Sequence, residues 1–292
     1  MTATEKASVL TEALPYLQRF RGKTFLIKMG GSAMDNPDLV RKVMRDIVFL
    51  EVSGIKPVIV HGGGKAISAA MIEAGLEARF IGGFRVTTPE AIEIVEATLH
   101  GEINQGLVRT LTDFGAKATS VHGTSVFLAD QLMGTDDDGN PADIGRVGKA
   151  TSCHIEDILY ALSTGKVPVV SPLGRQNGSG HTLNINADLA AAALACALKP
   201  AKLVYLSDVP GLMQDPSKPD SLIHSVTRSE ATDLLNDGTI SGGMIPKVNS
   251  ALEALSAGVE KVHFIDGREP HTLLLEIFTQ SGIGTEIRET RS

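Results

Sequence analysis

The sequence has no tryptophan, only two cysteines and few aromatic side chains in a chain of 292 residues. Aromatic residues make up 4% and hydrophobic residues 42%, so the core must be mainly aliphatic. Cys153 and Cys196 lie far apart in the sequence, and neither belongs to a metal-ligand pattern. This usage predicts free, buried thiols in a reducing cytosol and no metal centre. We therefore expect a cytoplasmic protein.

An excess of positive charge and long apolar runs are also missing. The net charge is −7 and there is no basic run, which argues against nucleic acid as a partner. The longest apolar run, Leu189–Leu198, is rich in alanine and too short to span a bilayer. Residues 1–6 carry no signal-peptide pattern. The length fits one large domain or two closely packed ones.

A glycine turn between an apolar strand and a helix organises the chain. Residues 57–60 predict a buried strand, Gly62–Gly64 a tight turn, and Lys65 the start of a helix. Glycines allow close approach of a ligand to backbone N–H groups, and a helix N-terminus carries partial positive charge. The pattern predicts an anion site, although a tight turn without a ligand remains an alternative at this point.

Two common nucleotide motifs are excluded at this turn. A P-loop needs glycine at position 59 and Ser or Thr at position 66, where the chain has Ile59 and Ala66. The dinucleotide fingerprint needs a glycine where Ile67 stands, so a nucleotide-dependent dehydrogenase is disfavoured.

Strand and helix patterns alternate along most of the chain, which predicts an α/β fold with a parallel sheet. We expect strands at 24–29, 57–60, 117–122, 167–171, 203–208, 261–265 and 282–287, and helices at 5–20, 37–54, 65–71, 89–114, 155–163, 188–198 and 244–257. Pro15 should kink the first helix. Residues 126–147 predict a β-hairpin and residues 174–180 a polar loop. A change in composition near residue 175 suggests two lobes.

Three glycine turns are expected at strand ends, at residues 30–31, 62–64 and 242–243. Lysines flank two of them: Lys28 precedes the first and Lys247 follows the third. Lone lysines are usually solvated, but Lys28 ends an apolar strand, so its charge must face a pocket or a partner. Together the turns and lysines favour a site for several phosphates.

Other polar residues have both a structural and a functional interpretation. Asp188 starts the alanine-rich helix, where it either favours the helix dipole or holds the two lysines. Asp208 and Gly211 end a strand and either form a turn or face a nucleotide. Arg85 lies either on the surface or against a substrate carboxylate. His61 has no Ser or Cys partner in the sequence, so we assign it no catalytic role.

Six segments together resemble the amino-acid kinase family. They are Lys28-Met29-Gly30-Gly31-Ser32, His61-Gly62-Gly63-Gly64, Phe84-Arg85-Val86-Thr87, Asn184-Ile185-Asn186-Ala187-Asp188, Ser207-Asp208-Val209-Pro210-Gly211 and Gly242-Gly243-Met244-Ile245-Pro246-Lys247. The resemblance covers residues 10 to 288. It implies a three-layer sandwich with a mostly parallel central sheet and helices on both faces.

Within the family, the chain is similar to the members that phosphorylate the γ-carboxylate of N-acetyl-L-glutamate in arginine biosynthesis. The resemblance implies ATP with Mg²⁺ as the phosphoryl donor and no tightly bound cofactor. It assigns catalysis to Lys28, Lys247 and Asp188, substrate binding to Gly63, Gly64, Arg85 and Asn184, and nucleotide binding to Gly30, Gly31, Asp208 and Gly211. Met29 and Ser32 depart from residues common in relatives, which should affect shape more than chemistry.

The resemblance also implies an organisation and a regulation. Residues 21–174 would form an N-lobe for the amino-acid substrate and dimerisation, and residues 175–292 a C-lobe for ATP. The N-terminal kinked helix, residues 1–20, resembles the extension of arginine-inhibited members, in which it links dimers into a hexamer. Arginine would bind Tyr16, His263, Glu276, Gly282 and Gly284.

Two alternative functions remain open at the sequence level. One is another acyl-phosphate-forming kinase of the family, acting on glutamate or carbamate. The other is a sensor that binds arginine and a nucleotide without catalysis, although a sensor has no need to keep Lys28, Lys247 and Asp188 together.

Overall fold

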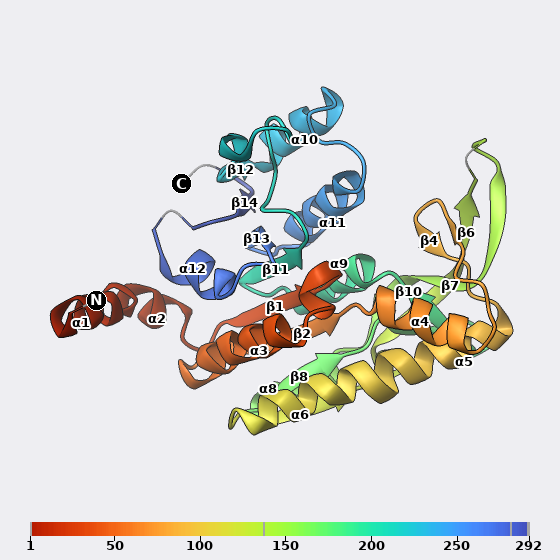
Figure 1. Cartoon of the computed structure of the whole chain (residues 1–292), viewed down its shortest axis with the longest axis horizontal. Helices are drawn as coiled ribbons and strands as arrows, with labels where there is room; N and C mark the ends of the chain where they lie inside the picture. The colour runs from red at the N-terminus through yellow and green to blue at the C-terminus, as the bar shows by residue number, and fades with distance from the viewer. Residues whose placement is uncertain (1, 137, 281, 291–292) are drawn as a thin grey trace.

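The computed structural model describes residues 2–136, 138–280 and 282–290. Within this part of the chain, an eight-stranded sheet forms the centre of the molecule (Figure 1). Its order is β12 (Ser225–Thr227), β14 (Thr285–Arg288), β13 (Lys261–Asp266), β11 (Lys202–Ser207), β1 (Thr24–Met29), β2 (Lys56–His61), β8 (Val167–Val170) and β5 (Ala118–Val121). Neighbouring strands are parallel except β13 and β14, which are antiparallel.

Strand β1 lies near the middle of the sheet, between β2 and β11. Five of its six residues are buried, as expected for a parallel strand covered on both faces. Met29 at its end pairs in register with His61 of β2 and Leu206 of β11. The three strands therefore end at one edge of the sheet, and the loops that follow them meet there.

Helices cover both faces, which confirms the predicted three-layer α/β sandwich. One face packs on α3 (Pro37–Val52), α6 (Gln105–Asp113) and α12 (Thr272–Phe278), and the other on α8 (Glu156–Ser163), α9 (Ala187–Leu198), α10 (Arg228–Asn236) and α11 (Met244–Ser256). Phe25 and Ile27 of β1 belong to the first core and Leu26 to the second, because neighbouring strand residues point to opposite faces. Helix α9 is central because its buried alanines allow close packing.

A small closed barrel lies at one end of the molecule (Figure 1). It consists of β6 (Phe127–Thr135), β7 (Pro141–Cys153), β9 (Leu173–Gln176) and β10 (Thr182–Ile185). The antiparallel β6–β7 pair is the predicted hairpin. The polar loop predicted at 174–180 was wrong for its first residues, because barrel closure draws them into β9. Strand β10 lies beyond the predicted lobe boundary at 174 and still pairs with β7 and β9.

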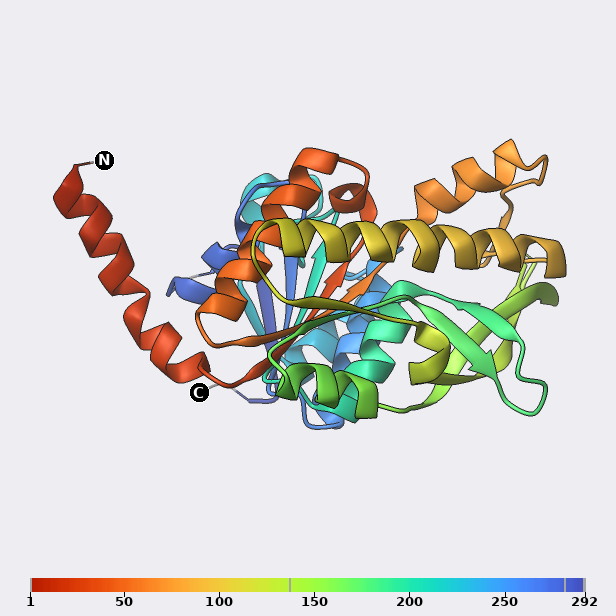
Figure 2. The same cartoon turned by 90° about the horizontal axis from the view of Figure 1, so that it is seen from below.

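The N-terminal segment forms two helices, α1 (Ala3–Glu12) and α2 (Leu14–Phe20), instead of one kinked helix. The break falls at Ala13, and Pro15 lies in the first turn of α2, where its missing N–H costs no hydrogen bond. Figure 2 shows this segment extending away from the rest of the molecule.

The long helix predicted from residue 89 to 114 is continuous but not uniform. It contains α5 (Pro89–Glu96), a π-helical segment η2 (Ala97–Asn104) and α6. The remaining elements are η1 (Gly31–Met34), α4 (Gly64–Glu73), β3 (Phe80–Ile81), β4 (Phe84–Arg85), α7 (Gly123–Val126) and η3 (Pro219–Ser221). None of the helices in these ranges is long and apolar enough to cross a membrane.

Candidate active site

The first two glycine turns meet at the edge where β1 and β2 end. The Gly62 N–H donates to the Met29 carbonyl at 2.7 Å, and a Cβ added at Gly62 would lie 3.6 Å from the Gly30 Cα. The third turn, at residues 242–243, was wrongly expected at a strand end. It follows α10 and opens α11, so it contributes a helix N-terminus.

Two lysines and a carboxylate converge beside these turns. Lys28 of β1 places its Nζ 2.6 Å from Asp188 Oδ1, an ion pair without hydrogen-bond geometry, and Lys247 of α11 donates from Nζ to Asp188 Oδ2 at 2.5 Å. Burial acts to raise the pKa of Asp188, but the charges of both lysines outweigh it and lower the pKa to about 2. Asp188 therefore stays ionised and holds two cations in one place.

Local structure explains how two of these side chains, Asp188 and Lys28, reach this point. The Asn186 side chain caps α9 by accepting from the N–H groups of Asp188 and Leu189, at 2.9 and 3.3 Å, and so fixes the first turn of the helix. Lys28 folds back over the first glycine turn, where a Cβ on Gly30 would lie only 2.1 Å from its Nζ. A side chain at position 30 would therefore displace the Lys28 ammonium group.

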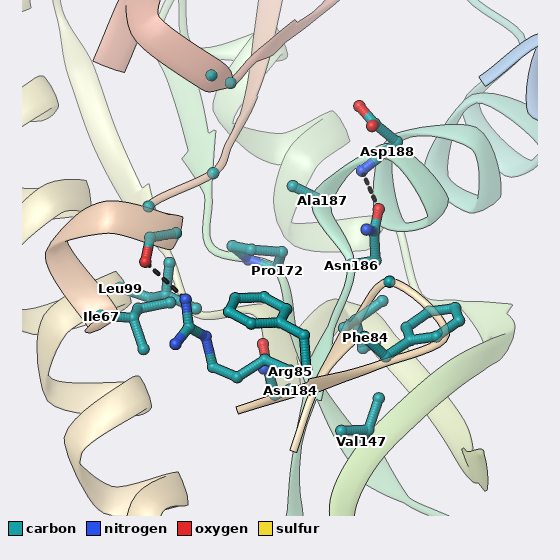
Figure 3. A pocket seen from close by; sticks show the side chains of 18 of the residues that line it. Ile67, Phe84, Arg85, Leu99, Val147, Pro172, Asn184, Asn186, Ala187 and Asp188 are labelled. Atoms are coloured by element: carbon teal, nitrogen blue, oxygen red, sulfur yellow. Dashed lines mark hydrogen bonds between the residues drawn. The ribbon is translucent and has the colours of Figure 1, made fainter. Parts of the chain in front are cut away.

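A cleft of about 210 Å³ opens next to the lysines. It is lined by Lys28, Asp188, the glycines 30–31 and 62–64, Arg85, Asn184 and Asn186, with apolar walls from Ile67, Phe80, Phe84, Leu99, Val147 and Ile185. In Figure 3, Asp188 and Arg85 stand on opposite sides of the cleft. The cleft thus has the Lys28–Asp188 ion pair at one end, Arg85 at the other and an apolar middle.

Arg85 is held in a defined orientation. Its Nη2 donates to the Gly64 carbonyl at 2.6 Å and to Ser68 Oγ at 2.9 Å, and its guanidinium lies 4.6 Å from the centre of the Phe80 ring. Burial lowers its pKa, but a guanidinium remains charged at any pH of interest. These bonds use part of its five N–H donors. Asn184 lies near it and donates to Thr87 Oγ1 at 3.2 Å.

A second cleft of about 320 Å³ adjoins the first, and Gly31, Gly63, Gly64, Phe80 and Arg85 line both. It adds Asp208 and an ion pair between Lys65 and Asp35 at 2.8 Å. Gly31 has a φ of +59°, and a Cβ there would lie 1.9 Å from Asp208 Oδ1. Gly31 must therefore be glycine for the turn to approach Asp208.

The structure brings ten of the eleven predicted catalytic, substrate and nucleotide residues to these clefts or to the ion-pair cluster beside them. Gly211 is the exception, because it lines neither cleft and is buried against Thr285. The Thr285 hydroxyl accepts a hydrogen bond from the Leu212 N–H at 2.8 Å. The position of Gly211 therefore agrees with a structural role in the turn.

A third cavity of about 360 Å³ lies between α2 and the far strands of the sheet. Tyr16, His263, Glu276 and Gly282 line it, and the Gly284 N–H donates to Glu276 Oε2 at 2.9 Å. The five residues predicted to bind arginine therefore lie together.

Three buried side chains in the wall of this third cavity, His263, Glu276 and Lys202, contact one another. His263 Nδ1 lies 2.6 Å from Glu276 Oε1, and its Nε2 lies 2.7 Å from Lys202 Nζ. Burial would raise the pKa of Glu276, but hydrogen bonds from His263 and from the 283–284 backbone keep it low. Burial and the Lys202 charge lower the pKa of His263.

Sequence reasoning missed several residues of the site. Asn186 lies in one of the six family-like segments, and the sequence predicted no function for it, although an asparagine two residues before Asp188 is a helix-capping signal. Phe80 gave no signal, because a single aromatic residue in a short extended segment is common. His61 lacks a nucleophile partner but lies directly under the glycine turn, with Nδ1 2.9 Å from the Gly62 carbonyl oxygen.

The two cysteines are free, as predicted, but half-buried instead of buried. They line a surface cavity together, because β7 and α9 pack side by side. Burial raises the pKa of Cys153 to about 12, which keeps this thiol protonated and unreactive. In the described ranges no group of three or more His, Cys, Asp or Glu side chains is placed to hold a metal ion.

Comparisons with known proteins bear on this arrangement. Residues 23–266 match the model of the amino acid kinase family. The chain belongs to the amino acid kinase family. Within that family, it is 64% identical to acetylglutamate kinase of Akkermansia muciniphila over 98% of this chain and 97% of the relative. It is 44% identical to acetylglutamate kinase of Halothermothrix orenii, over 98% of each chain.

Solved structures share the fold of this chain. N-acetylglutamate synthase from Neisseria gonorrhoeae, complexed with coenzyme A and N-acetyl-glutamate, superposes with a TM-score of 0.83 at 26% identity. The match covers 98% of this chain and 64% of that longer one. The complex of the same synthase with coenzyme A and L-arginine gives a TM-score of 0.79 at 25% identity, over 97% and 65% of the chains.

Proposed function

We propose that this protein uses ATP to phosphorylate the γ-carboxylate of N-acetyl-L-glutamate, giving N-acetyl-L-glutamyl 5-phosphate in arginine biosynthesis. The observation that carries the proposal is the convergence of Lys28 and Lys247 on Asp188 at the mouth of a cleft that ends in Arg85. Relatives named acetylglutamate kinase, with up to 64% identity over nearly the whole chain, support the same activity.

The reaction needs alignment and positive charge but no general base. A carboxylate with a pKa of about 4.3 is already ionised at neutral pH. One of its oxygens attacks the γ-phosphorus of ATP, and the bond from that phosphorus to the β–γ bridging oxygen breaks, so that ADP leaves with the electron pair. No proton moves in this step. The His and Cys side chains outside the cleft are therefore not required.

The two lysines are placed to stabilise the phosphoryl group during transfer. Charge spreads over the equatorial phosphoryl oxygens in the transition state, and preorganised cations stabilise it most where water is excluded. The Lys28 and Lys247 side chains are 7% and 20% exposed. Asp188 orients both ammonium groups and reduces their mutual repulsion, which favours assigning it a positioning role.

The first cleft suits an N-acetylated amino dicarboxylate. Arg85 would bind the α-carboxylate at the far end, and Asn184 would take a polar group of the substrate. Backbone N–H groups of Gly63 and Gly64 would bind the γ-carboxylate near Lys28. The apolar wall between the two ends matches a methylene chain and an acetyl methyl group.

The second cleft suits the polyphosphate of ATP, with N–H groups donated by Gly31 in its wall and by the adjacent Gly30 of the first cleft, and with Asp208 at the nucleotide side. Gly211 would contribute only by shaping the turn after Asp208. Mg²⁺ would arrive on ATP, held mainly by phosphates and water. Of the residues that line this cleft, only Asp208 belongs to residues 175–292, so the proposed C-lobe for ATP rests on the family resemblance and on Asp208.

Acyl-phosphate trapping tests the proposed activity. The protein is incubated with ATP, Mg²⁺ and hydroxylamine plus N-acetyl-L-glutamate, L-glutamate or carbamate, and hydroxamate and ADP are measured. We expect product only with N-acetyl-L-glutamate. Product with glutamate or carbamate alone would assign another kinase activity of the family, and binding without ADP release would assign a sensor.

We also propose that L-arginine inhibits the enzyme by binding in the third cavity. The buried Glu276 carboxylate and the acidic Glu286 lie in its wall, and carboxylates are natural partners of a guanidinium. The gonococcal synthase solved with L-arginine, which shares this fold, is consistent with the proposal. Millimolar arginine should lower turnover at saturating substrates, and Glu276→Gln should weaken that inhibition. Unchanged turnover of the wild type would refute it.

We further propose that α1 and α2 join copies of this chain into a hexamer. Leu10 and Leu14 are 70% and 50% exposed on a segment that extends from the body. Light scattering should give a hexamer for the wild type and a dimer for the double variant Leu10→Glu, Leu14→Glu. A wild-type monomer would contradict the proposal.

A further inference from the structure

Every carbonyl of the Gly62–Gly64 loop accepts a hydrogen bond from the protein. The Gly62 carbonyl faces His61 Nδ1 at 2.9 Å, the Gly63 carbonyl accepts from the Ile67 N–H at 2.9 Å, and the Gly64 carbonyl accepts from Arg85 Nη2 at 2.6 Å. The N–H groups of Gly63 and Gly64 find no acceptor in the described part of the chain. The carbonyl partners thus decide which way the free N–H groups face.

His61 can donate a hydrogen bond to the Gly62 carbonyl in only one neutral tautomer. A carbonyl oxygen is an acceptor, so Nδ1 must carry the proton and Nε2 must be the acceptor. The Asn104 side-chain amide supplies the matching donor, with Nδ2 3.2 Å from His61 Nε2. Asn104 Nδ2 also lies 2.9 Å from the Val169 carbonyl, so both of its neighbours are acceptors and its own orientation is fixed.

The π-helical segment η2 brings this amide under the loop. Asn104 is the last residue of η2 and is fully buried, while Leu99 and Ile103 of the same segment pack against the loop. A Cβ at Gly63 would lie 2.4 Å from Ile103 Cδ1 and 3.0 Å from Leu99 Cδ2. A π-helix widens the turn by one residue, and such segments are frequent at functional sites.

The orientation of the Asn104 amide leaves one of its polar atoms unsatisfied by any described residue, which indicates that the side chain has a role other than packing. Asn104 Oδ1 is buried and has no hydrogen-bond partner within the described residues. An unsatisfied buried acceptor normally destabilises the folded state, so a residue chosen for packing alone would be apolar. Instead the chain keeps a donor aimed at His61.

We propose that the His61–Asn104 pair is a positioning element, which holds the Gly62–Gly64 loop so that its free N–H groups face the acceptor carboxylate during phosphoryl transfer. His61 does not touch the substrate or move a proton. It acts through the loop, and its contribution to the rate rests on the proposed function.

Two substitutions at His61 form a matched pair. His61→Asn keeps a side-chain N–H near the position of Nδ1, whereas His61→Leu has a similar volume and no donor. Both lose the Nε2 acceptor for Asn104. We expect His61→Leu to lower kcat about tenfold with KM for ATP within about twofold, and His61→Asn to recover most of that loss. Equal losses in both variants, or wild-type kcat in His61→Leu, would overturn the proposal.

A measurement on the unmodified protein covers the case in which these variants do not fold. Long-range ¹H–¹⁵N NMR of the imidazole reports which ring nitrogen carries the proton. We expect the Nδ1–H tautomer in the wild type and a mixture of tautomers in Asn104→Leu, which removes the donor to Nε2. A wild-type Nε2–H tautomer would overturn the proposal. Absence of kinase activity would refute the proposed function while leaving this geometric test intact.

Discussion

Replacing Lys28 by methionine should abolish most of the phosphoryl transfer while leaving the cleft in place. Methionine keeps much of the side-chain length and packing but removes the charge. Loss of one preorganised charge partner of a transition state costs about 3 kcal/mol, which corresponds to roughly a 100-fold lower kcat. The same change at Lys247 should cost somewhat less, because its side chain is 20% exposed against 7% for Lys28 and water partly screens it.

The assay is steady-state ADP release at saturating ATP and N-acetyl-L-glutamate. A charge partner used only in the transition state lowers kcat and leaves KM nearly unchanged. Lys23→Met is the matched control, because Lys23 precedes the same strand, is half-exposed and, among the described residues, forms an ion pair only with Glu260 at 3.4 Å. It should keep kcat within about twofold of the wild type. A kcat within threefold of wild type for Lys28→Met would refute the assignment of this lysine.

Three further predictions test other parts of the site. Arg85→Lys should raise KM for N-acetyl-L-glutamate about tenfold with little change in kcat, because an ammonium cannot replace a bidentate fork; unchanged KM in substrate titrations would contradict this. Gly31→Ala should raise KM for ATP about tenfold, since φ is +59° and the new Cβ meets Asp208; nucleotide titration checks it, and wild-type affinity would show that the turn adapts. Burial lowers the pKa of His61 from 6.5 to about 4, so the unfolded chain binds more protons between those pH values and stability falls as pH drops through that window. Urea unfolding from pH 7 to 4 should show the wild type losing about 3 kcal/mol relative to His61→Asn, and parallel pH curves would contradict the burial of a neutral imidazole.

The layered fold could be predicted because local signals agree with the tertiary structure. Buried strands such as β1 carry continuous apolar residues, and Asn36 caps α3 one residue before a proline, as helix-start rules predict. Elements without such signals were not predicted. Strand β12 has only three residues, and α12 shows no polar–apolar periodicity to separate it from a loop.

The π-helical segment η2 could not be predicted from the sequence for a different reason. Apolar residues from Ile92 to Leu111 keep the spacing of one regular helix, so periodicity alone favours an uninterrupted α-helix. The extra residue in the turn is stabilised by contacts far away in the sequence, from Asn104 to His61 and Val169. Long-range hydrogen bonds of this kind leave no local pattern.

The site was predicted in part for a similar reason. Motifs pointed to Lys28, Asp188 and Lys247 as separate residues, but only the tertiary fold brings the end of β1 and the starts of α9 and α11 together. The tilt of Lys28 over Gly30 and the contact of Phe80 with Arg85 depend on side-chain packing. Neither can be derived from spacing along the chain.

The pairing of β1 with both β2 and β11 limits how the enzyme opens and closes around its substrates. The two halves of the molecule are joined by a continuous ladder of backbone hydrogen bonds instead of a loose tether. Movement of the two halves relative to each other therefore has to change the twist of this ladder, in which β1 lies between β2 and β11. Lys28 lies on β1 and Lys247 on α11, which packs on one face of the sheet, so such a change of twist alters the distance between the two ammonium groups.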